Sequence, residues 1–201
     1  MPVAELLAGP ALTVGGVDVG GPVKGFHYAV LSGAGLVDSG RADSPDRLAT
    51  AIASHAPTVV AVDGPRSLAP DGLAGRPCER DFLGEGMCGL RLTPDRATMV
   101  ARGGENHLAW IGRGLDLYRR LDAGPWQVIE CFPTAAWTVW GGARNGRSRA
   151  RWSAAVLAGF ELSGVPARMS QDARDALGAA LTALAFARGM HRSFGELVLP
   201  A

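Results

Sequence analysis

The sequence predicts a single α/β domain built on a mixed β-sheet, and three features support this. The chain opens with three consecutive apolar segments of strand length. A helix-like segment and another apolar strand follow, an order that implies a right-handed crossover to a parallel neighbour. With 201 residues, 47% of them hydrophobic, the chain can bury one sizeable core but is too short for two ordinary domains. We therefore expect one domain over residues 1–201.

The first three strands are expected over residues 11–19, 26–31 and 36–39. The first segment is apolar and β-branched, which is typical of a strand buried on both faces. The stretch between the second and third segments, Ser32-Gly33-Ala34-Gly35, has the composition of a hairpin turn. These segments predict three strands that run antiparallel to their neighbours.

A helix, a strand and a long insertion are expected next. Ser44-Pro45-Asp46 supplies an N-cap, a first-turn proline and a first-turn acid, and Pro57 ends the predicted helix. The apolar segment 58–62 predicts a fourth strand, which terminates in Asp63. Residues 66–104 are rich in glycine and proline and show no sustained periodicity, so we expect a long irregular insertion. Loops of this length in a compact domain usually act as lids or binding loops.

Helical and strand patterns alternate in the second half of the chain. The expected elements are a helix from Glu105 to Gly124, a strand over 126–129 that ends at Glu130, a short helix over 132–140, a glycine- and arginine-containing loop over 141–151, and a helix marked by Trp152, Val156 and Phe160. A long Ala- and Leu-rich helix follows Ser170 and stops at Gly189. We expect this helix to end the fold.

Charge and cysteine content exclude several classes of protein. The formal net charge is only +1, so a protein that binds polyanions through a strong overall positive charge is not expected. Of the 20 basic residues, 19 are arginine. The three cysteines are an odd number without paired-ligand spacing, which argues against a disulfide framework or a zinc site. The N-terminus lacks a signal-type pattern and no window of about 18 apolar residues exists. These features predict a soluble, cytoplasmic protein with no membrane partner.

Acidic residues stand at the ends of three predicted strands: Asp18, Asp63 and Glu130. Ligands of open α/β sheets collect at the carboxyl ends of the strands, so these acids are expected to share one edge. Asp172 and Asp175 lie three residues apart at the start of the last predicted helix, and therefore on one helix face.

Acids gathered in a partly dehydrated crevice repel one another, so a cation is expected among them. Oxygen ligands favour Mg²⁺ or Mn²⁺ over zinc, and one or two ions are expected. Two such ions about 3.5–4 Å apart can activate water and stabilise the leaving oxygen in phosphodiester cleavage.

Each acid also has a simpler interpretation. Asp18 and Asp63 both precede glycine-containing turns and can stabilise them. Glu130 can be solvated or can pair with an arginine. Asp172 can serve as the N-cap of the last helix.

Five motifs carry a resemblance to a known family. They are Gly16-Val17-Asp18, Val62-Asp63-Gly64-Pro65, Gly75-Arg76-Pro77-Cys78-Glu79-Arg80, Ile129-Glu130-Cys131-Phe132-Pro133 and Asp172-Ala173-Arg174-Asp175-Ala176-Leu177. In this order they resemble the family called domain of unknown function 429, which is described as predicted nucleases of RNase H-like fold. The resemblance covers nearly the whole chain and implies an RNase H-like mixed sheet with helices on both faces.

The acids are also similar to those of Holliday-junction resolvases within the RNase H-like superfamily. The resemblance implies metal-dependent phosphodiester cleavage, with Asp18, Asp63 and Asp175 as metal ligands and Asp172 as a further catalytic acid. The resolvases typically have Glu at the position of Asp63. Glu130 has no counterpart among the acids of the resolvases. It can be a metal ligand, a general base or a supporting residue.

Other residues suggest a nucleic-acid partner. Arg144, Arg147 and Arg149 lie on the glycine-containing loop and can contact phosphates, although a solvated basic loop fits the same pattern. The histidines at 27, 55, 107 and 191 are not at metal-ligand spacing and are expected to be structural or exposed, with His107 in reach of the site as the exception to test.

Two alternative functions stay open. Gly16-Val17-Asp18-Val19-Gly20-Gly21 resembles the first phosphate loop of the sugar-kinase and actin-like fold, which suggests a nucleotide-directed phosphohydrolase or phosphotransferase. The other alternative is a catalytically idle domain that binds nucleic acid or protein.

Overall fold

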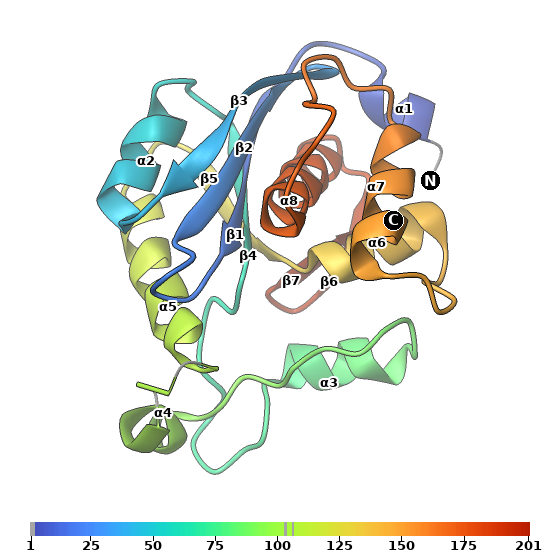
Figure 1. The fold of residues 1–201 in the computed structure, drawn as a ribbon. Coiled ribbons are helices and arrows are strands. Elements are labelled where there is room, and N and C mark those ends of the chain that lie inside the picture. Colours follow the sequence, from blue (N-terminus) through green and yellow to red (C-terminus); the bar gives the residue numbers. More distant parts are fainter. Residues whose placement is uncertain (1–2, 103, 106) are drawn as a thin grey trace.

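The protein folds around a seven-stranded mixed sheet with the strand order β3-β2-β1-β4-β5-β7-β6 (Figure 1). The structure is a computed structural model, and it describes residues 3–102, 104–105 and 107–201. The strands are β1 (Thr13–Val19), β2 (Phe26–Ser32), β3 (Gly35–Ala42), β4 (Val59–Asp63), β5 (Gln127–Cys131), β6 (His191–Phe194) and β7 (Leu197–Pro200). The helices are α1 (Val3–Leu7), α2 (Pro45–Ala53), α3 (Pro77–Gly84), α4 (Arg96–Arg102), α5 (Ala109–Leu121), α6 (Pro133–Gly141), α7 (Arg149–Ala158) and α8 (Gln171–Ala187).

The pairing of the strands confirms the predicted mixed sheet. β2 is antiparallel to both β1 and β3, as the hairpin signal indicated. β4 lies parallel to β1 and β5 lies parallel to β4, so the crossover through α2 is also confirmed. The helix start at Ser44 is as predicted, because the Ser44 hydroxyl accepts a hydrogen bond from the backbone of Arg47.

The chain does not end with its long helix, contrary to the sequence expectation. After α8 it forms a hairpin of two four-residue strands, β6 and β7, and β7 pairs parallel to β5. All four residues of β7, Leu197–Pro200, are buried. Such short strands carry too few residues for a clear periodicity, and the partner of β7 lies more than 60 positions earlier in the sequence.

The insertion after β4 is also more regular than expected, because it contains α3 and α4. Pro77 occupies the first turn of α3, and the Glu79 carboxylate accepts a hydrogen bond from the backbone of Arg76 at the N-cap. Helices of seven or eight residues are too short to show a helical repeat in a glycine- and proline-rich stretch. The glycine- and arginine-containing loop is correspondingly shorter than predicted, since α7 begins at Arg149.

Helices cover both faces of the sheet. α8, α6 and α7 lie over one face, whereas α2 and α5 lie over the other (Figure 1). α8 is almost entirely buried, with alanines and leucines packed against β1, β2 and β4. Trp137, Trp152 and Phe160 complete the core on this side. No helix within the described ranges is long and apolar enough to cross a membrane.

A glycine in β1 sets how closely α8 approaches the sheet. A Cβ atom added at Gly16 would lie 2.0 Å from the backbone nitrogen of Ala180 and 2.2 Å from the carbonyl oxygen of Ala176. Asp18 is two residues further along the strand and so faces the same side. The glycine therefore permits the contact that brings the start of α8 to Asp18.

We expect Gly16→Ala to destabilise the protein by about 3 kcal/mol or more, because the added methyl group meets helix backbone rather than movable side chains. Gly15→Ala is the matched control, since a Cβ there would meet Val60 and Ile52 side chains at ordinary distances of 3.4 and 3.5 Å. Urea unfolding of the two variants measures the difference. Equal stability of both variants would contradict this account of the packing.

Candidate metal centre

Asp18 and Asp63 lie side by side at the carboxyl edge of the sheet. β1 and β4 are parallel neighbours, and Asp18 is directly in register with Asp63. Paired residues in neighbouring strands point to the same face, so both carboxylates lie on the side covered by α8. Both residues are half-buried. The expectation that these two strand ends meet is confirmed.

The first turn of α8 brings two further acids to this edge. Ser170 is the N-cap, and its hydroxyl accepts a hydrogen bond of 3.0 Å from the backbone of Ala173. The interpretation of Asp172 as the cap is therefore wrong. Asp172 instead forms an ion pair of 3.0 Å with Lys24, the only lysine of the chain.

Asp175 is the most deeply buried acid of the group, with 3% of its side chain exposed. The indole nitrogen of Trp137 donates a hydrogen bond of 3.1 Å to its carboxylate, and the Gln171 amide donates at 3.0 Å. The Arg149 guanidinium lies 3.0 Å from the same carboxylate. These contacts fix the orientation of the Asp175 side chain.

The pKa values of the acids are displaced in the direction expected of a crowded anionic site. Burial raises the pKa of Asp18 to about 7, with further contributions from Asp175 and Asp172. Burial also raises the pKa of Asp63 well above its ordinary value, and Asp18 and Asp175 add to the effect. Burial raises the pKa of Asp175 despite the opposing effect of Arg149.

This electrostatic situation fits a divalent cation. Lys24 and Arg149 are the only side-chain cations within the described residues that form ion pairs with these four acids. Two single positive charges do not compensate four carboxylates. The raised pKa values of Asp18, Asp63 and Asp175 reflect burial first and repulsion between the carboxylates second. An all-oxygen donor set of this kind suits Mg²⁺ or Mn²⁺.

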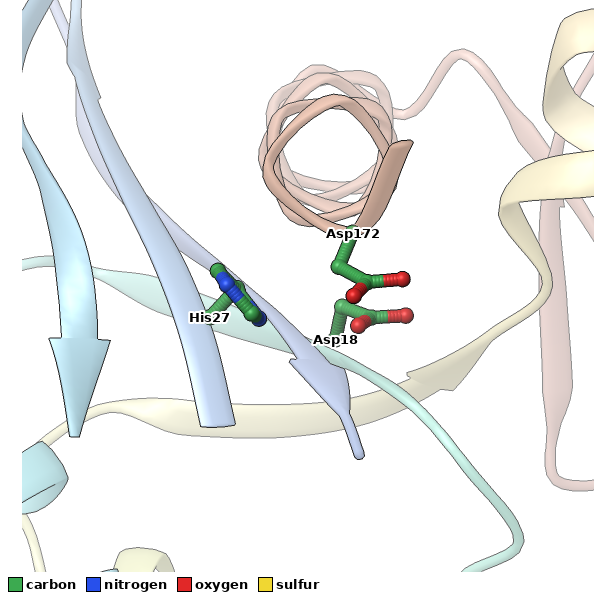
Figure 2. Close-up of side chains that lie close together, drawn as sticks. All are labelled: Asp18, His27 and Asp172. Carbon is green, nitrogen blue, oxygen red and sulfur yellow. The ribbon is translucent and has the colours of Figure 1, made fainter. Parts of the chain in front are cut away.

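His27 lies beside these acids, although the sequence did not indicate it as a site residue. It is the register partner of Asp18 across the antiparallel pair of β1 and β2. One ligand atom each of Asp18, His27 and Asp172 lies within 4.8 Å of the others (Figure 2). Burial lowers the pKa of His27, which favours the neutral ring. The sequence predicts the strand that contains His27, but only the register of β1 with β2 identifies His27 as the neighbour of Asp18.

Glu130 lies on the other face of the sheet and does not join the four aspartates. In the parallel pair of β4 and β5, Glu130 is in register with Val62, whereas Cys131 is in register with Asp63. The Glu130 carboxylate is buried and accepts hydrogen bonds from both terminal nitrogens of Arg76 and, at 2.8 Å, from the backbone of Arg66. It thus belongs to an ion-pair network at the base of the insertion.

The three arginines proposed for phosphate contact differ in their surroundings. Arg149 is at the start of α7 and faces Asp175. Arg144 and Arg147 are exposed in the preceding loop, where Arg147 donates hydrogen bonds to the carbonyls of Arg144 and Ala143. His107 pairs with Glu105 at 3.4 Å and is not part of the cluster around Asp18.

The strand order, the half-buried aspartates at the ends of two neighbouring parallel strands and the acidic helix start define an α/β domain of RNase H-like fold. The chain belongs to the family described as "Protein of unknown function (DUF429)", whose profile matches residues 16–197. The family resemblance stated from the five motifs is therefore confirmed.

Solved structures with the same fold support this assignment. The chain is similar to the RuvC structure of Thermus thermophilus, with a TM-score of 0.52 and 16% sequence identity over 89% of this chain and 97% of the other. It is also similar to T. thermophilus RuvC in complex with a Holliday junction substrate, with a TM-score of 0.50 and 15% identity over 89% and 96% of the two chains. No curated protein sequence matches the chain.

Proposed function

We propose that this protein is a metal-dependent nuclease that hydrolyses phosphodiester bonds of nucleic acid. The observation that carries the proposal is that Asp18 and Asp63 lie in register at one edge of the sheet. Asp175 lies near enough to both to raise their pKa values, which burial already raises. The fold likeness to RuvC, whose structure with a Holliday junction substrate is known, supports nucleic acid as the substrate class.

Asp18, Asp63 and Asp175 would hold Mg²⁺ or Mn²⁺, as one or two ions. When bound, the cation would supply a Lewis acid that lowers the pKa of water and stabilises charge on the leaving oxygen. Asp18 must lose its proton before it can contribute a full negative charge, and in the metal-free protein its pKa is about 7. Trp137 and Gln171 keep the Asp175 carboxylate in place.

The remaining predicted residues have supporting roles in this proposal. Arg144 and Arg147 are exposed next to α7 and would contact phosphates of the substrate without reading its sequence. Asp172 adds negative charge on the solvent side of the cluster, where 24% of its side chain is exposed. Glu130 acts as a positioning residue, because it holds the backbone of Arg66, three residues after Asp63.

The experiment is a cleavage assay with four-way junction, duplex and single-stranded DNA and with RNA, each with Mn²⁺, Mg²⁺ or EDTA. We expect cleavage only with a divalent cation. Asp18→Asn and Asp175→Asn should lower the rate at least about a hundredfold, since each removes charge that holds the ion. Asp116→Asn is the matched control, because Asp116 is exposed on α5 and pairs only with Arg119 within the described chain.

Three results would contradict the proposal. Full activity in Asp18→Asn and Asp175→Asn would remove the aspartate cluster from the mechanism. Release of inorganic phosphate from mononucleotides without cleavage of any nucleic acid would favour a nucleotide phosphohydrolase, and cation-independent binding without turnover would favour an idle binding domain.

A further inference from the structure

We propose that Asp18, His27 and Asp172 form a second cation position, which shares Asp18 with the proposed all-carboxylate position, and that it selects Mn²⁺ over Mg²⁺. A catalytic role for this position rests on the proposed function. Binding of Mn²⁺ to the position does not, and it can be measured without substrate. The three residues come from β1, β2 and the first turn of α8 (Figure 2).

The spacing of the three side chains fits one ion. Their ligand atoms lie within 4.8 Å of one another. Ligands bind Mn²⁺-sized cations at distances of about 2.0–2.4 Å, so two ligands of one ion are separated by at most about 4–5 Å. The register of β1 and β2 fixes two of the three, because Asp18 and His27 are directly opposite each other.

Lys24 already places a positive charge at this position. Its ammonium lies 3.0 Å from both carboxylate oxygens of Asp172, and 63% of the Lys24 side chain is exposed. A flexible, exposed ammonium can move into solvent when a cation of higher charge binds Asp172. The His27 side chain has a free nitrogen as well, since its buried Nδ1 has no hydrogen-bond partner within the described part of the chain.

The choice of metal follows from the ligand types. Imidazole nitrogen suits transition-series cations, whereas Mg²⁺ prefers oxygen ligands and keeps much of its water. The proposed position at Asp18, Asp63 and Asp175 would offer only oxygen ligands, so it would accept either ion. The position with His27 adds nitrogen and should bind Mn²⁺ more tightly than Mg²⁺.

The test is pulsed electron paramagnetic resonance of Mn²⁺ bound to the full chain, because electron spin echo modulation detects nitrogen that is bonded directly to Mn²⁺. We expect histidine nitrogen modulation in the wild type and in His55→Ala, and none in His27→Ala. His55 is the matched control, since its imidazole also pairs with an aspartate, Asp38, at 3.0 Å, but is not part of the cluster. Mn²⁺ affinity should fall at least about tenfold in His27→Ala, and Mg²⁺ affinity less than about twofold.

A second variant tests the same position if His27→Ala does not fold. Lys24→Met removes the competing ammonium and should tighten Mn²⁺ binding while leaving the nitrogen modulation intact. The inference is overturned if saturating Mn²⁺ gives no nitrogen modulation in the wild type, or if the modulation persists in His27→Ala. A protein that shows this modulation but cleaves no nucleic acid would contradict the proposed function alone, and an active nuclease without it would contradict this inference alone.

Discussion

Replacing Arg76 with alanine is expected to lower the free energy of unfolding by about 3–5 kcal/mol, because it leaves buried carboxylates without their cation. Arg76 is 3% exposed and its guanidinium donates hydrogen bonds to Glu79, Glu130 and Glu196. Glu79 also accepts hydrogen bonds from Thr93. The network therefore ties α3 and the insertion to β5.

Arg80→Ala is the control for the Arg76 prediction. Arg80 lies in α3, four residues after the N-cap Arg76, is exposed and donates a hydrogen bond of 3.2 Å to the carbonyl of Ala74. Its loss should change stability by less than about 1 kcal/mol. Urea unfolding measures both variants. An Arg76→Ala protein as stable as Arg80→Ala would show that the buried carboxylates do not need the guanidinium.

Asp18→Asn is expected to weaken the pH dependence that the aspartate cluster imposes on stability. The pKa of Asp18 is about 7 in the folded protein, against an ordinary value of 3.8. Between these values the folded state holds a proton that the unfolded chain releases, so the metal-free protein loses stability as pH rises from about 4 to about 7. Asp63 and Asp175 act in the same direction because their pKa values are also raised.

Thermal unfolding at pH 5 and pH 8, with EDTA or Mn²⁺, measures this effect. At pH 8 the Asp18→Asn substitution should raise the metal-free Tm by about 2–8 °C, corresponding to about 1–2 kcal/mol, with little change at pH 5. Mn²⁺ should stabilise the wild type at pH 8 more than at pH 5, and the variant much less at either pH. A wild-type Tm that responds neither to pH nor to Mn²⁺ would contradict the electrostatic account.

The sequence was sufficient to place Asp18 and Asp63 together, because each ends a strongly apolar strand and the strands are adjacent and parallel. Glu130 follows the same rule and yet lies on the other face. It is offset by one residue from Cys131, the register partner of Asp63, and a shift of one residue moves a side chain across the sheet. Strand register is a tertiary property that spacing within one strand does not reveal.

His27 and the C-terminal hairpin were missed for related reasons. His27 is identified as a site residue only by the pairing of β1 with β2, which places it opposite Asp18. One histidine within a strand gives no metal-ligand spacing. β7 is stabilised by its pairing with β5, which is distant in the sequence. The fold class, by contrast, depends on local patterns repeated along the whole chain, so it could be predicted from the sequence.

The most direct measurement is a crystal structure of the protein with Mn²⁺, in which anomalous scattering locates the ion. We predict anomalous density bounded by the carboxylates of Asp18, Asp63 and Asp175, and its loss in crystals of Asp175→Asn. Crystals at pH 8 and saturating Mn²⁺ that carry no anomalous density at these three carboxylates would contradict the metal centre and, with it, the nuclease mechanism proposed for this protein.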